Sequence, residues 1–469
     1  MAIYLNRRDM IGGALGASLT ACTATKPKFD AQVIVIGAGL SGLYAAMLLE
    51  DEGKDVLVIE ADNRIGGRMK TLRHQDGVTE GGGQQIGASY ARILDVAAKL
   101  NVPLYSETGR GPATAYYLDD QWQAAQELDV KLFPKAYRST PPSSVLFRLL
   151  AKEPALETSD AWRDAPENMD ISAAEFLSQR GFDAKAQNLI ERALNANQLS
   201  TYSMLNLHRS LQLYRQSANM GATQYVEGGS QRLPEAMAAS LKRPVKIGTK
   251  VSSIDLSGDR VAVTIAGARK TYHAEHVICT IPFAALSHPK GPKINAALNG
   301  VQKEAIQSLP YTQILQIHGR ANTAYWEQDG LAPSMWFDSP LERIFAQSDR
   351  NGKVTGFVTN WLNGVGTEGW LDGGEASAFK QLTDELSKVR PSLAENLNLL
   401  TTVNWTSSNP LAGGAYMHWA PGQARRWAAD MGQPAGRLYF AGEHLSHLHT
   451  GMEGAMESAE AAAFHLLNI

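Results

Sequence analysis

The sequence predicts an α/β protein built on a doubly wound, Rossmann-like domain, and three features near the N-terminus predict it. Residues 32–36 contain four consecutive Val and Ile, as a parallel strand buried on both faces requires. A glycine-rich turn at 37–42 leads into a helical pattern at 43–50. Residues 55–60 form a second apolar strand that ends in an acid. This order is typical of the first βαβ unit of a dinucleotide-binding domain.

Each glycine of the turn has its own role in such a unit. Gly37 permits the tight turn after the strand, and Gly39 lets the backbone approach a pyrophosphate. Gly42 allows the helix and the strand to pack closely. The N-terminus of the helix, with Leu40 and Ser41, then faces the phosphates. The turn therefore predicts a bound dinucleotide.

The acid at the end of the second strand is Glu60, which lies 18 residues beyond Gly42 (60 − 42). A carboxylate there accepts hydrogen bonds from ribose hydroxyls, and its charge opposes a 2′-phosphate. NADP is therefore disfavoured. Ala61 follows directly and is expected to border the same nucleotide.

The segments after this unit resemble the flavin amine oxidases. Gly66 and Gly67 with Arg68 and Thr71 match the GG-R-x-x-T signature of that family. Residues 80–87, EGGGQQIG, resemble its segment in which the backbone runs close to the flavin. NAD enzymes lack this continuation, so the resemblance implies FAD as the cofactor.

Further segments match the family in its own order along the chain. They are residues 225–234, 249–251, 277–282, 405–416 and 438–460. In the family, the helix that begins near residue 450 places the Met452 N–H at the pyrimidine oxygen of the flavin. The resemblance implies a cofactor-binding set of Gly37, Gly39, Leu40, Ser41, Gly42, Glu60, Ala61, Gly67, Arg68, Gly83, Gln84, Val251, Gly442, Glu443 and Met452.

The chain has 469 residues, too many for one ordinary core, so two domains are expected. The resemblance implies an FAD-binding domain assembled from residues 29–105, 224–290 and 401–469. It also implies a discontinuous substrate domain, a mixed sheet with helices, from residues 106–223 and 291–400. The active site is then expected between the two, facing the flavin.

Within the second insertion, the sequence predicts strands at 314–319 and 355–361 and a helix at 376–388.

Composition excludes several classes of function. The net charge is −3 and no long basic run occurs, so a nucleic-acid partner is not expected. The two cysteines, Cys22 and Cys279, form no CxxC or Cys/His cluster, so neither a metal site nor a disulfide framework is expected. Cys279 lies in an apolar run and is predicted to be a small buried residue.

The first 28 residues are interpreted as an address rather than as part of the folded body. The twin arginine Arg7-Arg8 precedes an apolar stretch, 10–21, that is too short to span a membrane. This pattern predicts Tat export to the periplasm. The stretch ends at Cys22 in a segment that resembles a lipobox, so the membrane is expected to be a partner only through a lipid anchor; ordinary cleavage is the alternative.

The family surrounds the substrate amine with two aromatic rings, and here one of the two is missing. Tyr416 matches the first ring, whereas Gly451 stands where the second would be. His449 is either a partial replacement or a structural residue. In covalent members a cysteine precedes the cage tyrosine; Ala415 replaces it, which implies non-covalent FAD. Amino-acid oxidases of the family often carry an arginine for the substrate carboxylate just after the Glu80 segment, and residues 86–93 lack that arrangement. Arg92 matches a position that is arginine in amine oxidases too, so it is interpreted as structural. This favours an amine without a carboxylate.

Two more residues complete the candidate catalytic set. Trp405 begins the segment WTSSNPLAGGAY, which matches the Trp–GG–aromatic pattern of the family. Many members place a lysine after a Pro-containing turn, where it holds a water near flavin N5, and Gln316 falls at that position. Superoxide forms less readily without a nearby cation. The electron acceptor is therefore expected to be oxygen or a periplasmic cytochrome or quinone.

The resemblance implies FAD-dependent oxidation of a small-molecule primary or secondary amine to an imine, by hydride transfer to flavin N5. The imine then hydrolyses to a carbonyl compound. Two alternatives stay open at this point. One is an L-amino-acid oxidase or dehydrogenase, and the other is a non-enzymatic, tethered flavoprotein that carries electrons.

Overall fold

In the computed structural model, which describes residues 29–268 and 270–468, strand β1 (Ala31–Ile36) is an interior strand of the first sheet, next to its edge strand. It pairs in parallel with β2 (Val56–Ile59) on one side and β11 (Thr271–Cys279) on the other. Cys279 ends β11 and is 1% exposed, which confirms that it is a buried residue. The predictions at residues 1–28, including Arg7, Arg8 and Cys22, lie outside the described residues.

The first sheet continues beyond these three parallel strands. Its remaining strands follow the order β12–β9–β10–β11, with β18 also paired to β11. Their bounds are β9 Val251–Asp255, β10 Val261–Ile265, β12 Lys293–Asn295 and β18 Leu438–Phe440.

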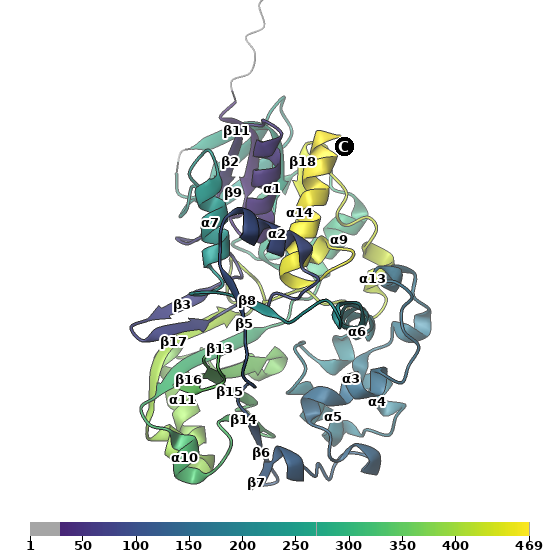
Figure 1. Cartoon of the computed structure of the whole chain (residues 1–469). Helices are drawn as coiled ribbons and strands as arrows, with labels where there is room; N and C mark the ends of the chain where they lie inside the picture. Colours follow the sequence, from purple (N-terminus) through teal and green to yellow (C-terminus); the bar gives the residue numbers. More distant parts are fainter. Residues whose placement is uncertain (1–28, 269, 469) are drawn as a thin grey trace, which may run out of the picture.

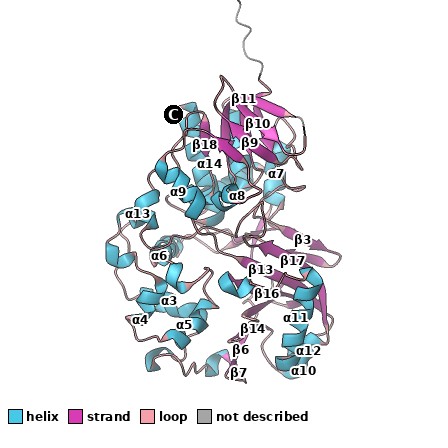
Figure 2. Cartoon of the chain, turned by 180° about the vertical axis from the view of Figure 1, so that it is seen from behind, coloured by secondary structure: helices cyan, strands magenta, loops and turns pink. Residues whose placement is uncertain are grey.

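Strand β1 is buried on both faces, as its sequence predicts. Val33 and Val35 pack with the helices on one face, whereas Ile34 and Ile36 pack with the antiparallel strands and the helices behind the sheet. The first face carries α1 (Leu40–Asp51), α2 (Ala91–Lys99), α7 (Arg232–Ser240) and α14 (Gly451–Leu467), as Figure 1 shows. Behind lie α8 (Phe283–Ser287), α9 (Gly300–Ser308) and α13 (Gln423–Trp427) (Figure 2). The doubly wound prediction is confirmed.

The second sheet lies below the first in Figure 1 and is mixed, because β14 and β6 pair in parallel while its other pairs are antiparallel. Its seven strands have the order β17–β13–β16–β15–β14–β6–β7. Their bounds are β6 Thr114–Leu118, β7 Gln121–Ala124, β13 Ile314–Ala321, β14 Ser334–Phe337, β15 Arg343–Ser348, β16 Val354–Asn363 and β17 Leu397–Trp405. Strands β13 and β16 confirm the predicted strands of the second insertion.

The two faces of this sheet differ. Leu315 and Ile317 of β13 pack on the core that includes helix α11 (Gly374–Val389), which confirms the helix predicted at 376–388. Helices α10 (Tyr325–Asp329) and α12 (Pro391–Ala394) lie at the same end. By alternation along the strand, Gln316 faces the opposite side.

A helical group forms the rest of the second body, at the lower right of Figure 1. It consists of α3 (Val145–Leu150), α4 (Ala173–Ser178), α5 (Ala184–Glu191) and α6 (Leu205–Ser217). Two short antiparallel pairs complete the structure: the hairpin of β3 (Thr71–His74) with β4 (Gly77–Glu80), and the long-range pair of β5 (Leu104–Ser106) with β8 (Gln224–Val226).

The predicted domain limits stay a prediction, but two strands cross them. Strand β12 belongs to the first sheet although its residues follow the limit at 290. Strand β17 begins before 401 and pairs with β13 throughout. The limit at 401 falls where the sequence shows no turn signal, whereas the limit at 290 falls in a Pro- and Gly-containing turn that leads into β12. Strand pairing is decided across the sheet, so local signals do not fix the domain limits.

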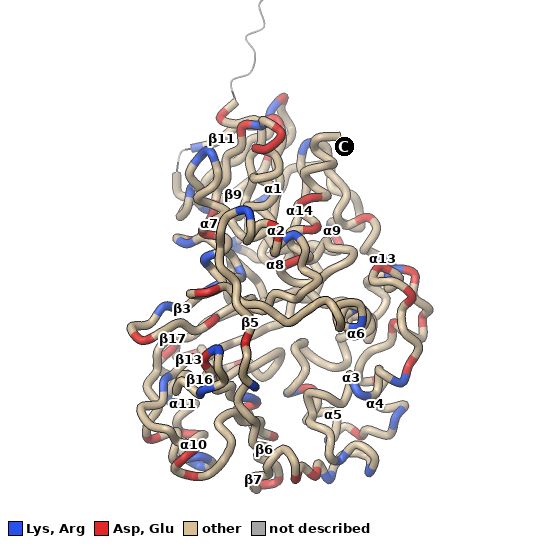
Figure 3. The backbone as a smooth tube through the Cα atoms, in the orientation of Figure 1, with Lys and Arg blue, Asp and Glu red and all other residues tan. Residues whose placement is uncertain are grey.

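The distribution of charge over the surface agrees with the small net charge of −3. Lys and Arg alternate with Asp and Glu over the face seen in Figure 3. Among the described residues, no helix is both long and apolar enough to cross a membrane.

Candidate functional site

A cavity of about 930 Å³ lies between the two sheets. Its wall draws on both ends of the chain, from β1 to the start of α14. Every residue of the predicted cofactor set except Gly42 lines it, and so do all three candidate catalytic residues, Tyr416, Gln316 and Trp405. One continuous space therefore joins the dinucleotide-binding turn to the residues expected around the substrate.

Two of the three glycines in the turn between β1 and α1 have no room for a side chain. Gly37 has φ +110°, and a Cβ there would lie 2.3 Å from the Thr280 Oγ1. A Cβ on Gly42 would lie 1.9 Å from the Gly37 carbonyl oxygen. Gly42 thus has the packing role predicted for it, although it does not line the cavity. Gly39 instead faces open space except for Gly67, whose Cα is 3.8 Å from a Cβ built on Gly39.

The N-terminus of α1 fits a pyrophosphate. Gly39 caps the helix without a side chain, so the N–H groups of Leu40 and Ser41 have no acceptor among the described residues. The Ser41 hydroxyl is also buried without a partner there. Free donors at a helix N-terminus form an anion site. The residues present therefore fit the phosphates of FAD.

Glu60 lies at the end of β2, where a ribose is expected. Its two carboxylate oxygens accept hydrogen bonds from the backbone N–H groups of Ala38 and Asp62, each at 2.7 Å. Burial raises the pKa of Glu60, and these two hydrogen bonds oppose that rise. The carboxylate is thus fixed by the turn itself, with its remaining lone pairs toward the cavity side.

Arg68 connects the first cofactor motif to the last. Its Nη1 donates to the Ala415 carbonyl oxygen and to the Glu443 Oε1, both at 2.8 Å. Glu443 is 8% exposed and also accepts from the Met417 N–H at 3.1 Å. The guanidinium therefore holds the chain on both sides of Tyr416.

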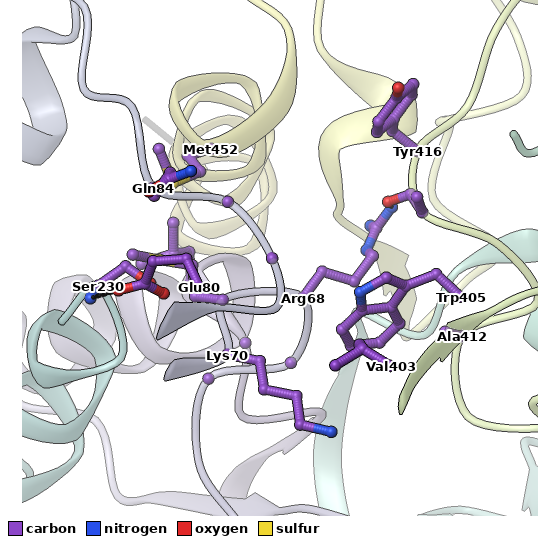
Figure 4. Close-up of a pocket in the computed structure, with 18 of the residues that line it drawn as sticks. Arg68, Lys70, Glu80, Gln84, Ser230, Val403, Trp405, Ala412, Tyr416 and Met452 are labelled. Atoms are coloured by element: carbon purple, nitrogen blue, oxygen red, sulfur yellow. Dashed lines mark hydrogen bonds between the residues drawn. The ribbon is translucent and has the colours of Figure 1, made fainter. Parts of the chain in front are cut away.

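Glu80 has a similar role on the other side of the cavity. It accepts from the Ser230 N–H at 2.7 Å, from the Ser230 hydroxyl at 2.6 Å and from the Thr71 hydroxyl at 3.2 Å. In Figure 4, Glu80 and Ser230 lie together on one side of Arg68. The β3–β4 pair and the distant segment at Ser230 meet at this carboxylate.

Helix α14 begins at the cavity wall. Thr450 caps it without a side-chain hydrogen bond, and the Met452 N–H has no acceptor among the described residues. A Cβ on Gly83 would lie 3.0 Å from the Met452 Sδ, so the two segments are in close contact. Figure 4 shows Met452 and Gln84 side by side. The N-terminus of α14 thus borders the cavity, and the placement of the Met452 N–H at the flavin stays a prediction.

The opposite wall carries the candidate catalytic residues. The Trp405 indole N–H donates to the Gly81 carbonyl oxygen at 2.6 Å, and Tyr416 lies on the same side of Arg68 (Figure 4). Gln316 is 1% exposed, and its Oε1 lies 2.9 Å from the His318 Nε2. Because an amide oxygen only accepts, His318 donates to it. The Gln316 NH₂ is left for the cavity.

The predicted gap in the aromatic cage is present. A Cβ on Gly451 would meet nothing within 4 Å. His449 does not line the cavity; its ring packs edge-on against Tyr90, and its Nδ1 lies 3.5 Å from the Glu457 Oε2. His449 is therefore a structural residue, and the space beside Gly451 stays open.

The cavity wall also contains cations that are absent from the sequence-based set, namely Arg64, Lys70, Lys250, Lys290 and Arg343, and two of them bear on the site. Lys70, in the loop before β3, lines the cavity, and its ammonium group makes no hydrogen bond or ion pair among the described residues. Burial lowers the pKa of Lys70, and the nearby Arg64 lowers it further. The second cation is Arg343 of β15. A basic residue inside an apolar strand pattern was the one signal for Arg343; Lys70 had none.

Comparison with known proteins agrees with this geometry. The family described as flavin-containing amine oxidoreductases matches residues 40–467. The chain is 27% identical to the flavin-dependent L-tryptophan oxidase RebO of Lentzea aerocolonigenes over 92% of this chain and 97% of that protein. It is 25% identical to human amine oxidase B over 93% and 86% of the two chains.

Solved structures show the same fold. Putrescine oxidase bound to putrescine superposes with a TM-score of 0.75 at 20% identity, covering 94% of this chain and 100% of that chain. Cyclohexylamine oxidase from Brevibacterium oxydans IH-35A gives 0.74, also at 20% identity, over 94% and 99%. The family match spans both bodies and nearly all of the cavity lining. The chain is therefore an oxidoreductase with FAD as its cofactor, and it belongs to the flavin-containing amine oxidoreductase family.

Proposed function

We propose that this enzyme oxidises a primary or secondary amine to an imine, which water then hydrolyses to a carbonyl compound. FAD bound in the cavity supplies the oxidant, since flavin N5 takes up the hydride that leaves the carbon beside nitrogen. The observation that carries the proposal is the single cavity that joins the pyrophosphate turn to Tyr416, Trp405 and Gln316. Substrate and cofactor can therefore meet without solvent between them.

The residues of this chain bind and orient the substrate. The Tyr416 ring forms one wall for the amine, and Trp405 is held rigidly by its bond to Gly81. Burial raises the pKa of Tyr416, so its hydroxyl stays neutral over the working pH range. Gln316 directs its NH₂ to the cavity and can hold a water there. None of these groups needs to act as a nucleophile.

An L-amino acid is the second candidate substrate, and the relatives of this chain support it as much as they support an amine. They include an L-tryptophan oxidase and an L-amino-acid oxidase of Siganus canaliculatus beside several amine oxidases. The two candidates differ in whether the best substrate carries a carboxylate.

The test is an anaerobic screen of the holoenzyme. Amines and amino acids are added one at a time, and the absorbance of the oxidised flavin at about 450 nm is followed. We expect rapid bleaching by at least one compound. If no amine or amino acid bleaches the flavin while dithionite does, the protein is an electron carrier and the proposed catalysis is wrong.

We also propose that the enzyme works in the periplasm. The twin arginine Arg7-Arg8 supports Tat export, and Cys22 supports a lipid anchor. Oxygen, a cytochrome or a quinone would then be the electron acceptor.

A further inference from the structure

The second sheet presents one row of side chains to the cavity. Across four neighbouring strands the register pairs Val403 of β17 with Gln316 of β13, Gln316 with Trp361 of β16, and Trp361 with Arg343 of β15. All four residues line the cavity. Two strand spacings separate Gln316 from Arg343, or roughly 10 Å. Arg343 thus lies at the end of the row remote from Val403.

Strand alternation shows which way Arg343 points. Ile344 belongs to the core beside α11, on the far face of the sheet, and does not line the cavity. Arg343 and Phe345 therefore project to the near face, where both line the cavity. The Arg343 Cζ lies 5.9 Å from the centre of the Phe345 ring.

The Arg343 guanidinium is buried without an anionic partner. The residue is 7% exposed, and it makes hydrogen bonds only to neutral acceptors, namely the Ala193 carbonyl oxygen, the Asn195 Oδ1 and the Asn363 Oδ1. Among the described residues Arg343 forms no ion pair with a carboxylate, and its Nε is buried with no partner. These three bonds leave two of the five guanidinium donors unused.

The closest carboxyl group is a weak counter-charge. Glu342 precedes Arg343, but its Oε2 accepts from the Asn363 N–H and it does not line the cavity. Burial raises the pKa of Glu342 to about 7, although Arg343 opposes that rise. Near neutral pH this carboxyl is therefore only partly ionised.

Other arginines of the chain show how such a cation is usually satisfied. Arg390, 1% exposed, binds Asp329 with its Nε and Nη2. Arg92 binds Glu453 and Glu460 of α14 and does not line the cavity. Arg209 is buried as well, but it donates to two backbone carbonyls away from the cavity. Arg343 alone among these combines burial, an unpartnered Nε and a place in the cavity wall.

A buried cation without its counter-ion is strongly unfavourable, and a carboxylate is the anion that a guanidinium binds best. We propose that Arg343 binds an anionic group of the substrate, so the amine oxidised here carries a carboxylate, as an amino acid does. This inference rests on the proposed function, and it selects the second candidate substrate class. It also reverses the expectation drawn from Arg92, because the anion site lies on β15 instead.

The cavity chemistry fits an aromatic or bulky amino acid. Trp361, Phe345, Trp405 and Tyr416 all line it, and the space beside Gly451 is open. The Arg343 charge is close enough to Tyr416 to oppose the rise that burial causes in the pKa of that tyrosine. The carboxylate and the amine of one small substrate can therefore reach both groups.

The experiment compares each amino acid with the amine that its decarboxylation gives, such as tryptophan with tryptamine and phenylalanine with phenethylamine. Anaerobic flavin bleaching and kcat/KM are measured for wild type, Arg343→Met, Arg343→Lys and the control Arg192→Met. Like Arg343, Arg192 opposes the rise in the pKa of Glu342, and its Nε is buried with no partner, but Arg192 does not line the cavity. We expect wild type to prefer the amino acid, and Arg343→Met to lower kcat/KM for it by about 10- to 100-fold.

The same variant should leave kcat/KM for the matched amine within about threefold, since no charge-assisted bond is lost there. Arg343→Lys should recover part of the loss, and Arg192→Met should change neither substrate. A preference of wild type for the amine overturns the proposal, and so does an equal loss for both substrates in Arg343→Met.

A binding measurement on wild-type holoenzyme avoids any variant that fails to fold. Phenylacetate and its neutral amide, phenylacetamide, are titrated while the flavin spectrum is recorded. Tighter binding of the carboxylate by about tenfold or more supports the anion site; equal binding overturns it. If carboxylates bind but no amine or amino acid bleaches the flavin, the anion site stands and the proposed oxidation fails. If amines bleach the flavin with no carboxylate preference, the oxidation stands and the anion site fails.

Discussion

Ala415 precedes the cage tyrosine and faces the cavity, where a thiol would be needed for a covalent flavin link. Its carbonyl oxygen accepts from Arg68, so the backbone at this point is fixed. An alanine methyl group forms no thioether. We therefore expect acid or heat denaturation to release all the flavin into the supernatant. Yellow colour in the washed protein pellet would contradict this.

The side chains of Gln316 and Lys70 determine whether this part of the cavity wall carries a positive charge. Burial lowers the pKa of His318 to about 3, so the imidazole bound to Gln316 is neutral. The position thus lacks a cation, as the sequence indicated. Lys70 lines the same cavity from the loop before β3 and supplies one that the sequence-based set missed.

This arrangement predicts the reaction with oxygen. A cation stabilises developing superoxide, so Gln316→Lys should raise the rate of reoxidation by oxygen about tenfold or more, and Lys70→Met should lower it. Stopped-flow reoxidation of the reduced enzyme measures both, with a c-type cytochrome as the alternative acceptor. If wild type already reacts fast in air and Lys70→Met is equally fast, neither residue controls the oxygen reaction.

At the scale of elements, the β1–α1 turn separates two uses of glycine. A Cβ on Gly42 would collide with the Gly37 carbonyl oxygen, whereas a Cβ on Gly39 would meet protein atoms only at ordinary contact distance. Gly39 also has φ −81°, which any residue adopts. One glycine therefore serves packing, and the other keeps space for a ligand.

The matched pair Gly42→Ala and Gly39→Ala tests this distinction. Gly42→Ala should destabilise the protein by about 1–3 kcal/mol through overpacking. Gly39→Ala should leave the stability of the apoprotein unchanged but raise the Kd for FAD by about tenfold or more, because the methyl group takes the place of the pyrophosphate. Urea unfolding of the apoproteins and fluorescence titration with FAD supply the two readouts. Equal effects of both changes on stability would contradict the assignment.

The same turn shows why part of the molecule could be predicted from sequence. The strand, the three glycines and the helix lie within a few residues of one another. The local sequence pattern is therefore enough to predict this part of the structure. Helix α14 and strand β13 were predicted for the same reason. Glu80 with Ser230, and Arg68 with Glu443, were located by family resemblance; their pairing is visible only in the folded chain.

Arg343 and Lys70 lie beyond such reasoning. Arg343 enters the site because β15 pairs with β16 and β16 with β13 in one particular register. A shift of one residue would turn its side chain into the core of the second body. Strand β17 crosses the predicted domain limit at 401 for a similar reason. Long-range pairing, not local pattern, places these residues.

At the scale of the whole molecule, the substrate amine must enter a largely desolvated space between two sheets. With an alkylamine as the test substrate, the pKa of the amine is near that of lysine, about 10.4, and only the neutral form gives up a hydride. Tyr416 stays neutral because burial raises its pKa. We therefore expect kcat/KM to rise with pH, by up to tenfold per unit between about pH 6 and 9. A flat profile over this range would show that deprotonation of the amine does not limit the reaction.

The cofactor site also has a consequence for export. Its walls come from β1 near one end of the chain, from β8 and β9 in the middle, and from α14 at the other end. No fragment contains the whole site, so FAD can bind only after the complete chain has folded. FAD is made in the cytoplasm, so the export proposed above would require the enzyme to cross the membrane already folded. The twin arginine Arg7-Arg8 is typical of the pathway that carries folded proteins.

We therefore expect Arg7→Lys with Arg8→Lys to leave folded, yellow holoenzyme in the cytoplasm of a Gram-negative host, with activity equal to wild type per flavin. Wild type should appear outside the cytoplasm with FAD bound. Cys22→Ser should still be exported but should lose its attachment to membranes, which separates the lipid anchor from export itself. Fractionation with flavin fluorescence measures both. Export of the double-lysine variant at the wild-type level would show that the arginine pair is not the signal.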